Sequence, residues 1–388
     1  MFHLAFDKLK YYCSKEQFKG YDPYDGLNSK FFQSLPFVCN SKWLRLIWIQ
    51  LFKRLPINLR PLVGIDKEYN SKGIALFLSG YCRQYKLSPS DENLNAIKFL
   101  VRKLVELRNP NYSGSCWGYP FDWQARAFFQ PKNTPTVVAT TYAACALLDA
   151  YAILGDDDCL QHARSACDFV LKDLNRTQGE GDTFAFSYSP LDSSVVYNAS
   201  LLGSRLLSRV YRLTGEEDLK TVARQSVAFC CNKQMDDGSW SYGVYAFHQW
   251  IDNFHTGFNL ECISQYARNC DDHQFDEILQ RGLEYYLNTF FTPEGISKYY
   301  HNELYPIDIH APAQLVVTIN ELNLWKTHAD LVKQVLHWTI ENMQSEEGFF
   351  IYQKKKFWSS SIPYMRWGQA WMFLAFSIYL SNTSDEKN

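Results

Sequence analysis

Residues 196–243 read VYNASLLGSRLLSRVYRLTGEEDLKTVARQSVAFCCNKQMDDGSWSYG and hold one whole structural unit. The first part, 196–211, is mostly apolar and rich in small residues, as expected of a helix buried inside a domain. The acidic turn TGEED follows, and its carboxylates suit the N-terminus of a second helix. That second helix, 217–232, carries apolar residues near i, i+3, i+4 and i+7, so one of its faces is polar. The stretch therefore predicts a helical hairpin that ends in the Gly-aromatic segment DGSWSYG.

The same unit recurs along the chain. Equivalent first helices begin roughly 55 to 65 residues apart, at 72–85, 136–151, 254–267, 309–322 and 366–380. Amphipathic second helices follow at 91–107, 157–173, 273–289 and 328–343. The Gly-aromatic segments that end these units are SGSCWGYPF, GEGDTFAFSY, PEGISKYY and EEGFFIYQ. The sequence thus predicts five complete hairpins and a sixth first helix that lacks a partner after it.

The last first helix, MRWGQAWMFLAFSIYL, has no polar face. An open solenoid of helical pairs would need a polar cap at this end, whereas a closed ring would bury it. We therefore predict an all-α, single (α/α)6 toroid over residues 41–383. In this prediction the helix 42–54 supplies the missing outer helix beside 366–380, and residues 1–40 form an N-terminal arm.

Particular segments resemble known toroid proteins. KQMDDGSWSYG (233–243) is similar to the repeat element of the prenyltransferase and triterpene-cyclase toroids. The hairpin plan resembles that of six-hairpin glycosidases and of α/α-toroid polysaccharide lyases and epimerases. Nearly the whole chain resembles toroid proteins of bacterial capsule and exopolysaccharide biosynthesis clusters, most distinctively at YDPYDGLNS (21–29) and CWGYPFDW (116–123). The resemblance implies a helical-repeat protein of cell-surface polysaccharide biosynthesis.

The composition indicates the compartment of the protein and the kinds of partner that it can bind. With a formal net charge of −2, the sequence does not indicate a positively charged surface for binding nucleic acid. Eleven cysteines without a CxxC pair favour reduced thiols and a cytoplasmic location. The N-terminus lacks the apolar core and small-residue cleavage site of a signal peptide. The run WLRLIWIQLF (43–52) is too short to span a bilayer. With the basic residues of segment 42–60 it could lie on the inner membrane surface, or pack as an amphipathic helix on the domain's own core.

The connections between helices differ in length on the two rims of the predicted ring. Short acidic turns lead from first to second helices, while long aromatic-rich segments lead back to the next first helix. Long ordered loops are often functional, and the helix N-termini that these loops reach favour anionic ligands. Aromatic faces can cover the C–H side of a sugar ring. We therefore predict a cleft on this rim for an acidic oligo- or polysaccharide.

Binding residues are predicted from these loops and helix starts. They are Trp117, Tyr119, Trp123, Arg126, Asn253, Tyr299, Tyr300, Arg366 and Trp367. The alternative role of such aromatics is to wedge neighbouring hairpins together, and it is favoured for Trp240 and Phe349 within the repeat. Asp22 and Asp25 are expected to form Asx turns, and whether they line the cleft is left open.

Two similar motifs, WIDNFH and PIDIHA, precede neighbouring first helices. An Asp and a His at a helix mouth can act as general acid and base, although a capping Asp beside a structural His is the alternative. The predicted catalytic residues are Asp252, His255, Asp308, His310, Asp122 and Tyr242.

The residues leave the chemistry open. Two carboxylates would suit glycoside hydrolysis, whereas Tyr, His and Asn would suit a lyase or C5-epimerase that moves the α-proton of a uronate. A non-catalytic glycan-binding or scaffold subunit is a further alternative. A prenyltransferase- or terpenoid-cyclase-like enzyme is disfavoured because no Asp-x-Asp-Asp acid is present. DNFHTGFNLECISQY resembles a zinc-ligand segment of prenyltransferases, but Cys116 lies more than two repeats from His255, so neither metal nor cofactor is expected.

Overall fold

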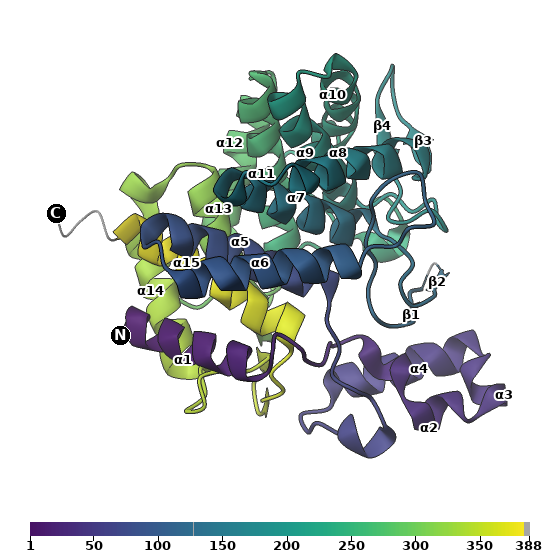
Figure 1. Ribbon diagram of the computed structural model, residues 1–388, viewed down its shortest axis with the longest axis vertical. Helices are drawn as coiled ribbons and strands as arrows, with labels where there is room; N and C mark the ends of the chain where they lie inside the picture. Colours follow the sequence, from purple (N-terminus) through teal and green to yellow (C-terminus); the bar gives the residue numbers. More distant parts are fainter. Residues whose placement is uncertain (127, 384–388) are drawn as a thin grey trace.

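A ring of six inner helices forms the centre of the molecule (Figure 1). The computed structural model describes residues 1–126 and 128–383. The inner helices are α5 (Ser71–Leu87), α7 (Val137–Leu154), α9 (Tyr197–Thr214), α11 (Asn253–Cys270), α13 (His310–Glu321) and α15 (Ala370–Thr383). Each contacts the next, and α15 contacts α5, so the ring is closed. The prediction of an all-α (α/α)6 toroid is confirmed.

Five outer helices each pack on the inner helix that precedes them. They are α6 (Asp91–Glu106), α8 (Asp157–Lys172), α10 (Glu217–Cys231), α12 (Asp276–Phe290) and α14 (Trp325–Met343). The acidic turns begin four of them, because carboxylates in the first turn meet the positive end of the helix dipole. Among the described helices, α7 alone is long and apolar enough to cross a membrane; 72% of that span is buried inside the ring.

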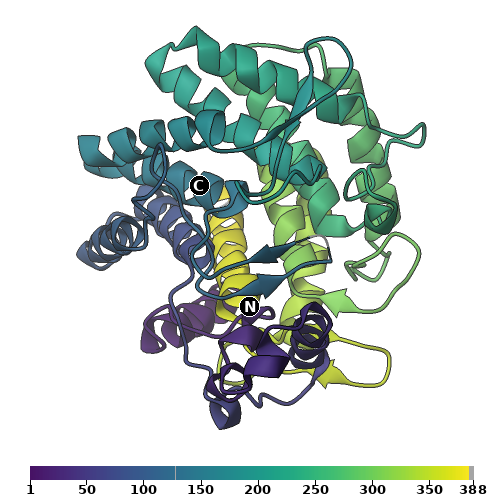
Figure 2. The ribbon, with the colours of Figure 1, turned by 90° about the vertical axis from the view of Figure 1, so that its right-hand side faces the viewer.

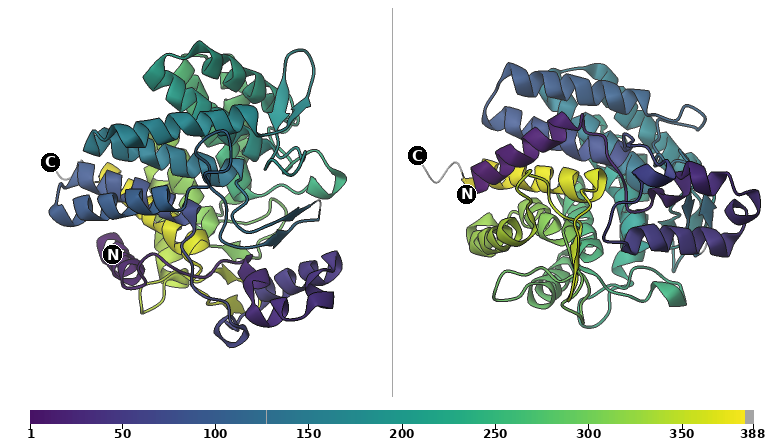
Figure 3. Two further views of the ribbon diagram at one scale, coloured as in Figure 1. Left: turned by 45° about the vertical axis from the view of Figure 1, so that its right-hand side comes forward. Right: turned by 90° about the horizontal axis from the view of Figure 1, so that it is seen from below.

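The sixth outer helix is α1 (Phe2–Lys15), which runs beside α15 (Figure 3, right). The Phe2 ring lies 4.7 Å from that of Tyr379, and the Phe6 ring lies 5.1 Å from that of Phe373. The prediction that 42–54 closes the ring is therefore wrong, and the first fifteen residues belong to the toroid rather than to an arm.

The repeat itself explains why α1 takes this place. In the third outer connection, Gln234 Nε2 donates to the carbonyl of Ile278 on the neighbouring outer helix, at 2.8 Å. In the fifth, Gln344 Nε2 donates to the carbonyl of Ala5 on α1, also at 2.8 Å. Gly348, with φ +98°, lies so close to α1 that a Cβ would be 2.5 Å from the Lys8 carbonyl oxygen. The repeat element thus docks on α1 as it docks on the other outer helices.

Residues 25–63 form a small helical lobe outside the ring (Figures 1 and 3). It contains η1 (Asp25–Asn28), α2 (Lys30–Gln33), α3 (Pro36–Cys39), α4 (Lys42–Arg54) and η2 (Pro61–Val63). Helix α4 packs on η1, α3 and the rim strand β1, and only Ile49 and Phe52 of α4 are buried. The alternative in which this helix packs on the ring core is therefore not what the chain adopts.

The long connections lie on the rim where the inner helices begin (Figure 2). They carry three small antiparallel sheets: β1 (Trp123–Gln124) with β2 (Phe129–Gln130), β3 (Arg176–Gln178) with β4 (Phe184–Phe186), and β5 (Ile307–Asp308), β6 (Gln353–Lys354) and β7 (Ser359–Ser360) in that order. Partner residues include Trp123 and Gln130 in the first, Asp308 and Gln353 in the third. A short 3-10 helix, η3 (Ala246–His248), precedes α11. This rim positions the candidate site.

Candidate functional site

A cavity of about 1250 Å³ lies between this rim, the α4 face of the lobe and the inner helices. Trp43, Ile47 and Leu51, one turn apart on α4, form an apolar outer wall. Aromatic side chains from the rim and inner helices form the rest: Trp123, Tyr188, Tyr242, Trp250, Phe254, Tyr299, Tyr300 and Trp367. The volume and aromatic lining suit a small oligosaccharide.

The charge of the lining is one-sided. Six basic side chains reach the cavity, namely Lys42, Lys53, Arg54, Lys72, Arg126 and Arg366, together with His248, His255 and His310. Within residues 1–126 and 128–383, no Asp or Glu lines it. A cleft of one sign of charge concentrates ligands of the opposite sign, so the cavity favours an anion.

Ten of the predicted site residues line this cavity. They are Tyr242, His255, His310, Tyr119, Trp123, Arg126, Tyr299, Tyr300, Arg366 and Trp367. They come from four of the long connections and the helices that follow, which only ring closure brings together.

Asp252 and His255 form a hydrogen-bonded pair at the start of α11. The carboxylate caps the helix by accepting from the backbone N–H of His255 at 2.9 Å, and its other oxygen lies 2.6 Å from His255 Nδ1. Trp250 Nε1 also donates to Asp252, at 3.1 Å. Asp252 is buried behind the imidazole, which reaches the cavity. With Nδ1 bound to Asp252, the Nε2 atom of His255 is the one left for a ligand. Asp252 can therefore cap α11 and orient the His255 imidazole at the same time.

Asp308 and His310 are arranged differently despite the similar sequence. Asp308 is fully buried and accepts from Gln353 Nε2 at 2.6 Å and from Trp367 Nε1 at 2.9 Å. Burial raises the pKa of Asp308 to about 6. It also accepts from the His310 backbone N–H, at the first residue of α13, at 2.9 Å. The prediction that Asp308 faces the ligand is wrong; it supports Trp367 instead.

The imidazole of His310 does line the cavity. It stacks on Phe254, with ring centroids 4.5 Å apart, and lies 4.3 Å from Trp371. Burial lowers the pKa of His310, and the nearby charges of Lys72, His255 and Arg366 lower it further. Among the described residues, none pairs with either ring nitrogen. His310 is therefore a neutral imidazole that is free to bond a ligand.

Three predicted residues lie elsewhere. Asp122 accepts the backbone N–H of Lys132 at 2.6 Å and does not line the cavity. Trp117 is buried in the core, where its Nε1 donates to the Leu104 carbonyl at 2.7 Å. Asn253 is buried and accepts from Tyr286 at 3.1 Å. Their predicted ligand contacts are wrong, because residues of the same loops and helix start also have to hold neighbouring hairpins together.

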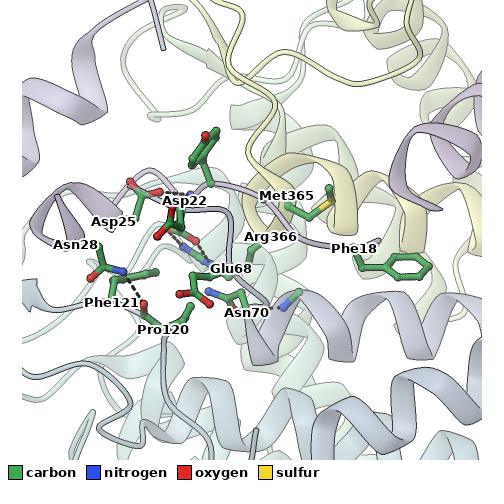
Figure 4. A pocket seen from close by; sticks show the side chains of 14 residues that line it. Phe18, Asp22, Asp25, Asn28, Glu68, Asn70, Pro120, Phe121, Met365 and Arg366 are labelled. Carbon is green, nitrogen blue, oxygen red and sulfur yellow. Dashed lines mark hydrogen bonds and ion pairs between the residues drawn. The ribbon is translucent and has the colours of Figure 1, made fainter. Parts of the chain in front are cut away.

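Arg366 and Trp367 sit on a π-helical turn, η4 (Met365–Gln369), just before α15. Arg366 donates twice to Asp22, with Nε–Oδ2 at 2.5 Å and Nη2–Oδ1 at 2.7 Å (Figure 4). Asp25 accepts from Arg60 Nε at 2.7 Å, and both Asp side chains also make the expected turn bonds. Asp22 and Asp25 line a separate small cavity rather than the large one. Asp22 binds the segment before the lobe to the ring, and Asp25 joins the two ends of the lobe through Arg60.

The sequence interpretation missed Lys72, which lies on α5 at the floor of the large cavity. It is 4% exposed, and its Nζ lies 4.3 Å from the Tyr142 ring centroid. A signal was present, because Lys72 begins an otherwise apolar first helix, KGIALFLSGY. Lysine at a helix end is usually solvated, so the pattern alone did not single it out.

No protein-family model and no curated protein sequence matches the chain. Solved structures do match in fold. Cellobiose 2-epimerase from Bacillus thermoamylovorans B4167 aligns with a TM-score of 0.64 at 12% identity, over 81% of this chain and 88% of the epimerase. A GH76 α-mannanase from Bacteroides thetaiotaomicron aligns with a TM-score of 0.63 at 12% identity, over 82% and 88%.

An unsaturated glucuronyl hydrolase specific for heparin aligns with a TM-score of 0.59 at 11% identity, over 82% of this chain and 87% of the hydrolase. At these identities the likeness concerns the fold. This chain therefore shares the (α/α)6 toroid of the six-hairpin glycosidase-like proteins.

Proposed function

We propose that the protein is a carbohydrate-active enzyme of the epimerase or lyase type, which moves a proton at a carbon atom of an acidic saccharide. One observation carries this proposal: the imidazoles of His255 and His310, at two inner-helix starts, face a cavity that His248 also lines and whose described lining has six basic side chains and no carboxylate. Imidazoles transfer protons near neutral pH, and fixed cations stabilise the negative charge that develops when a C–H bond is broken.

The two imidazoles have complementary roles in this proposal. His310, which is neutral because its pKa is lowered, accepts the proton from the carbon next to the uronate carboxylate. His255 donates a proton, since the Asp252 carboxylate stabilises its imidazolium form. Return of a proton to the opposite face of the carbon gives the epimer. Loss of the neighbouring glycosidic oxygen, with a proton supplied to it, gives an unsaturated uronate.

Hydrolysis by two carboxylates fits this site less well. That reaction needs carboxyl groups about 5–5.5 Å or 6.5–9.5 Å apart on either side of the scissile bond. Asp252 and Asp308 are buried behind other side chains, and Asp122 lies outside the cavity. Epimerases and hydrolases both occur among the structural neighbours, so the fold permits either reaction and the lining favours proton transfer.

The proposed substrate is an acidic polysaccharide or its precursor in cell-surface polysaccharide biosynthesis. The cationic lining supports the acidic character, and the whole-chain resemblance supports the pathway class. A cytoplasmic enzyme that contacts the inner membrane through the lobe belongs to the same proposal. Residues 26–65 contain six Lys or Arg and no Asp or Glu. Phe37 and Trp43 of this segment are 93% and 72% exposed, as suits contact with anionic lipid.

The test is incubation of the full-length protein with a panel of uronate-containing glycans. Deuterium uptake from heavy water reports proton exchange at carbon, and ultraviolet absorbance of an unsaturated uronate reports elimination. We expect one of these signals, and a fall of about 10²-fold or more in His255→Asn and His310→Asn. His273→Asn, on the far rim, is the matched control. Release of shorter glycans without either signal would contradict proton transfer, and binding without turnover would favour the glycan-binding alternative.

A further inference from the structure

Side chains from five of the six inner helices meet at the floor of the large cavity; three of them line the cavity, whereas those of α7 and α15 are buried and do not line it. The group comprises Lys72 of α5, Tyr142 of α7, Phe258 of α11, His310 of α13 and Trp371 of α15, here called the Lys72 cluster. Lys72 Nζ lies 4.3 Å, 5.1 Å and 5.2 Å from the ring centroids of Tyr142, Phe258 and Trp371. The ammonium group is thus surrounded by rings and reaches the cavity.

The hydrogen-bonding groups of the cluster lack partners. Within the described parts of the chain, Lys72 Nζ contacts aromatic rings but makes no hydrogen bond, and the Tyr142 hydroxyl, Trp371 Nε1 and both His310 nitrogens are buried without partners. Buried polar groups normally have partners, because an unmade bond inside a protein is costly. Of the N–H and O–H donors in the cluster, Lys72 Nζ is the one that reaches the cavity. The missing partner is therefore an acceptor.

The charges near Lys72 are already neutralised in pairs. Glu261 of α11 accepts from Arg205 Nη1 at 2.5 Å and from Gln314 Nε2 at 3.4 Å. Arg366 is held by Asp22 through two hydrogen bonds. Within the described residues, Lys72 is the one basic group of the cavity floor that no carboxylate balances, so its ammonium form needs a counter-charge from a ligand. A ligand that compensates it has to carry negative charge.

We infer that the Lys72 cluster binds the carboxylate of an acidic sugar, with Lys72 Nζ as the donor to its oxygens and the aromatic rings of the cavity lining against its C–H face. This inference rests on the proposed function for the identity of the ligand as a saccharide. His310 belongs to the cluster, so a carboxylate bound there puts its α-carbon beside the imidazole that accepts the proton. The cluster thus explains why a uronate, rather than a neutral hexose, would be processed.

Protonation of Lys72 provides an independent readout. Burial lowers the pKa of Lys72 well below its ordinary value, and the nearby Arg366 lowers it further. The amine is therefore largely neutral in the free protein at a pH between the lowered and the ordinary value. A bound carboxylate favours the ammonium form, so binding takes up a proton and weakens as the pH rises.

The experiment is calorimetric titration of the full-length protein with glucuronate, in buffers of different ionisation enthalpy. The neutral methyl ester of glucuronate, glucose and inorganic phosphate are titrated alongside. We expect glucuronate to bind at least about tenfold more tightly than the ester or glucose, with proton uptake. Lys72→Met should lose that advantage and the proton uptake, while its affinity for the ester stays unchanged. Lys132→Met, on a surface lysine of the rim, is the matched control.

Several outcomes would overturn the inference. These are parental glucuronate affinity in Lys72→Met, equal affinity for acid and ester, or tighter binding of phosphate than of glucuronate. Lys72→Met removes a buried unpaired amine and should fold. If it does not, Lys72→Gln, which keeps a polar end group but carries no charge, should weaken glucuronate binding but not ester binding. Equal weakening of both would contradict the donor role.

The same measurements separate this inference from the proposed function. Selective glucuronate binding without turnover of any glycan would defeat the proton-transfer proposal and leave the carboxylate site standing. Turnover that Lys72→Met does not alter would defeat the carboxylate site and leave proton transfer standing.

Discussion

At the scale of single residues, similar local sequences have unlike outcomes. Asp252 and Asp308 both accept from a backbone N–H at the start of an inner helix, yet only Asp252 pairs with an imidazole that reaches the cavity. The Asp308 carboxylate accepts hydrogen bonds from Gln353 and Trp367, which belong to another hairpin. The pairing of an Asp with a His thus depends on which distant donors compete for the carboxylate.

Asp252→Asn should lower turnover by about 10²-fold or more and leave the fold intact. Asn is as good a helix cap as Asp, so α11 still begins at the same residue, but Asn cannot stabilise the His255 imidazolium. Turnover and the circular dichroism melting curve check both parts. Asp122→Asn, outside the cavity, is expected to keep parental turnover; a comparable loss there would contradict the assignment.

Asp308 should make stability depend on pH. Its pKa is about 6 in the folded protein, against about 3.9 in the unfolded chain. The folded state therefore holds this proton more tightly, so Asp308 penalises folding as the pH rises from about 4 to about 6. Asp308→Asn lacks this penalty. Urea denaturation across that window should show the variant gaining stability relative to the parent, by roughly 2–3 kcal/mol. A constant difference would contradict the raised pKa.

At the scale of elements, the Gly-aromatic connection joins neighbouring hairpins through direct contacts. In the third and fifth connections a Gln side chain and a left-handed Gly meet the backbone of the next outer helix, and in the fifth that helix is α1. Closure of the ring thus uses the same contact that joins the other hairpins. The lobe is a separate addition that supplies the α4 wall of the cavity.

The role of α1 in closure can be measured with two phenylalanines. Phe6 is buried against α15, so Phe6→Ala should cost about 3–5 kcal/mol of unfolding free energy. Phe37 of the lobe is 93% exposed, and Phe37→Ala should change stability by less than about 0.5 kcal/mol. Chemical denaturation of both variants gives the comparison. Equal effects would mean that α1 does not stabilise the ring.

From the exposed apolar side chains of the lobe, we predict that the protein sediments with anionic vesicles. Phe37 and Leu62 are 93% and 82% exposed in a segment without acidic residues. We expect binding to phosphatidylglycerol-containing vesicles, little binding to phosphatidylcholine alone, and weakening by salt. The double variant Phe37→Ser and Leu62→Ser should bind about tenfold more weakly. Leu213→Ser, an exposed leucine at the end of α9, is the control. Parental binding by the double variant would reject this surface.

At the scale of the whole molecule, closure of the ring buries the apolar surfaces of the repeated inner helices. Trp371 and its neighbours on α15 are buried on every side because α5, α13 and α1 surround them. The same closure gathers the long connections on one rim and the Lys72 cluster on the cavity floor. The candidate site and the buried core therefore both result from closure of the ring.

The cysteines give a prediction for the folded chain. All eleven are free and ten are buried, with Cys39 the partly exposed one. Burial raises the pKa of Cys116 to about 12, which slows its reaction with thiol reagents. Titration under native conditions should find about one reactive thiol, and titration in denaturant without reductant should find eleven. Several missing thiols in denaturant would mean disulfides and would reject the reducing compartment.

The sequence alone predicted the hairpins, their count and the ring, because apolar first helices, acidic caps and Gly-aromatic ends are local signals that repeat. It also identified the rim and both imidazoles, since these lie directly at helix starts. It misassigned the closing helix: 2–15 and 42–54 are both amphipathic, and periodicity does not say which neighbour a helix face will meet. The same reason explains the residues that were misplaced or missed. The Asp308 carboxylate is occupied by partners from another hairpin, and the proposed role of Lys72 depends on side chains from four other inner helices. Contacts between segments far apart in the chain depend on how the whole ring closes, and no local pattern records that.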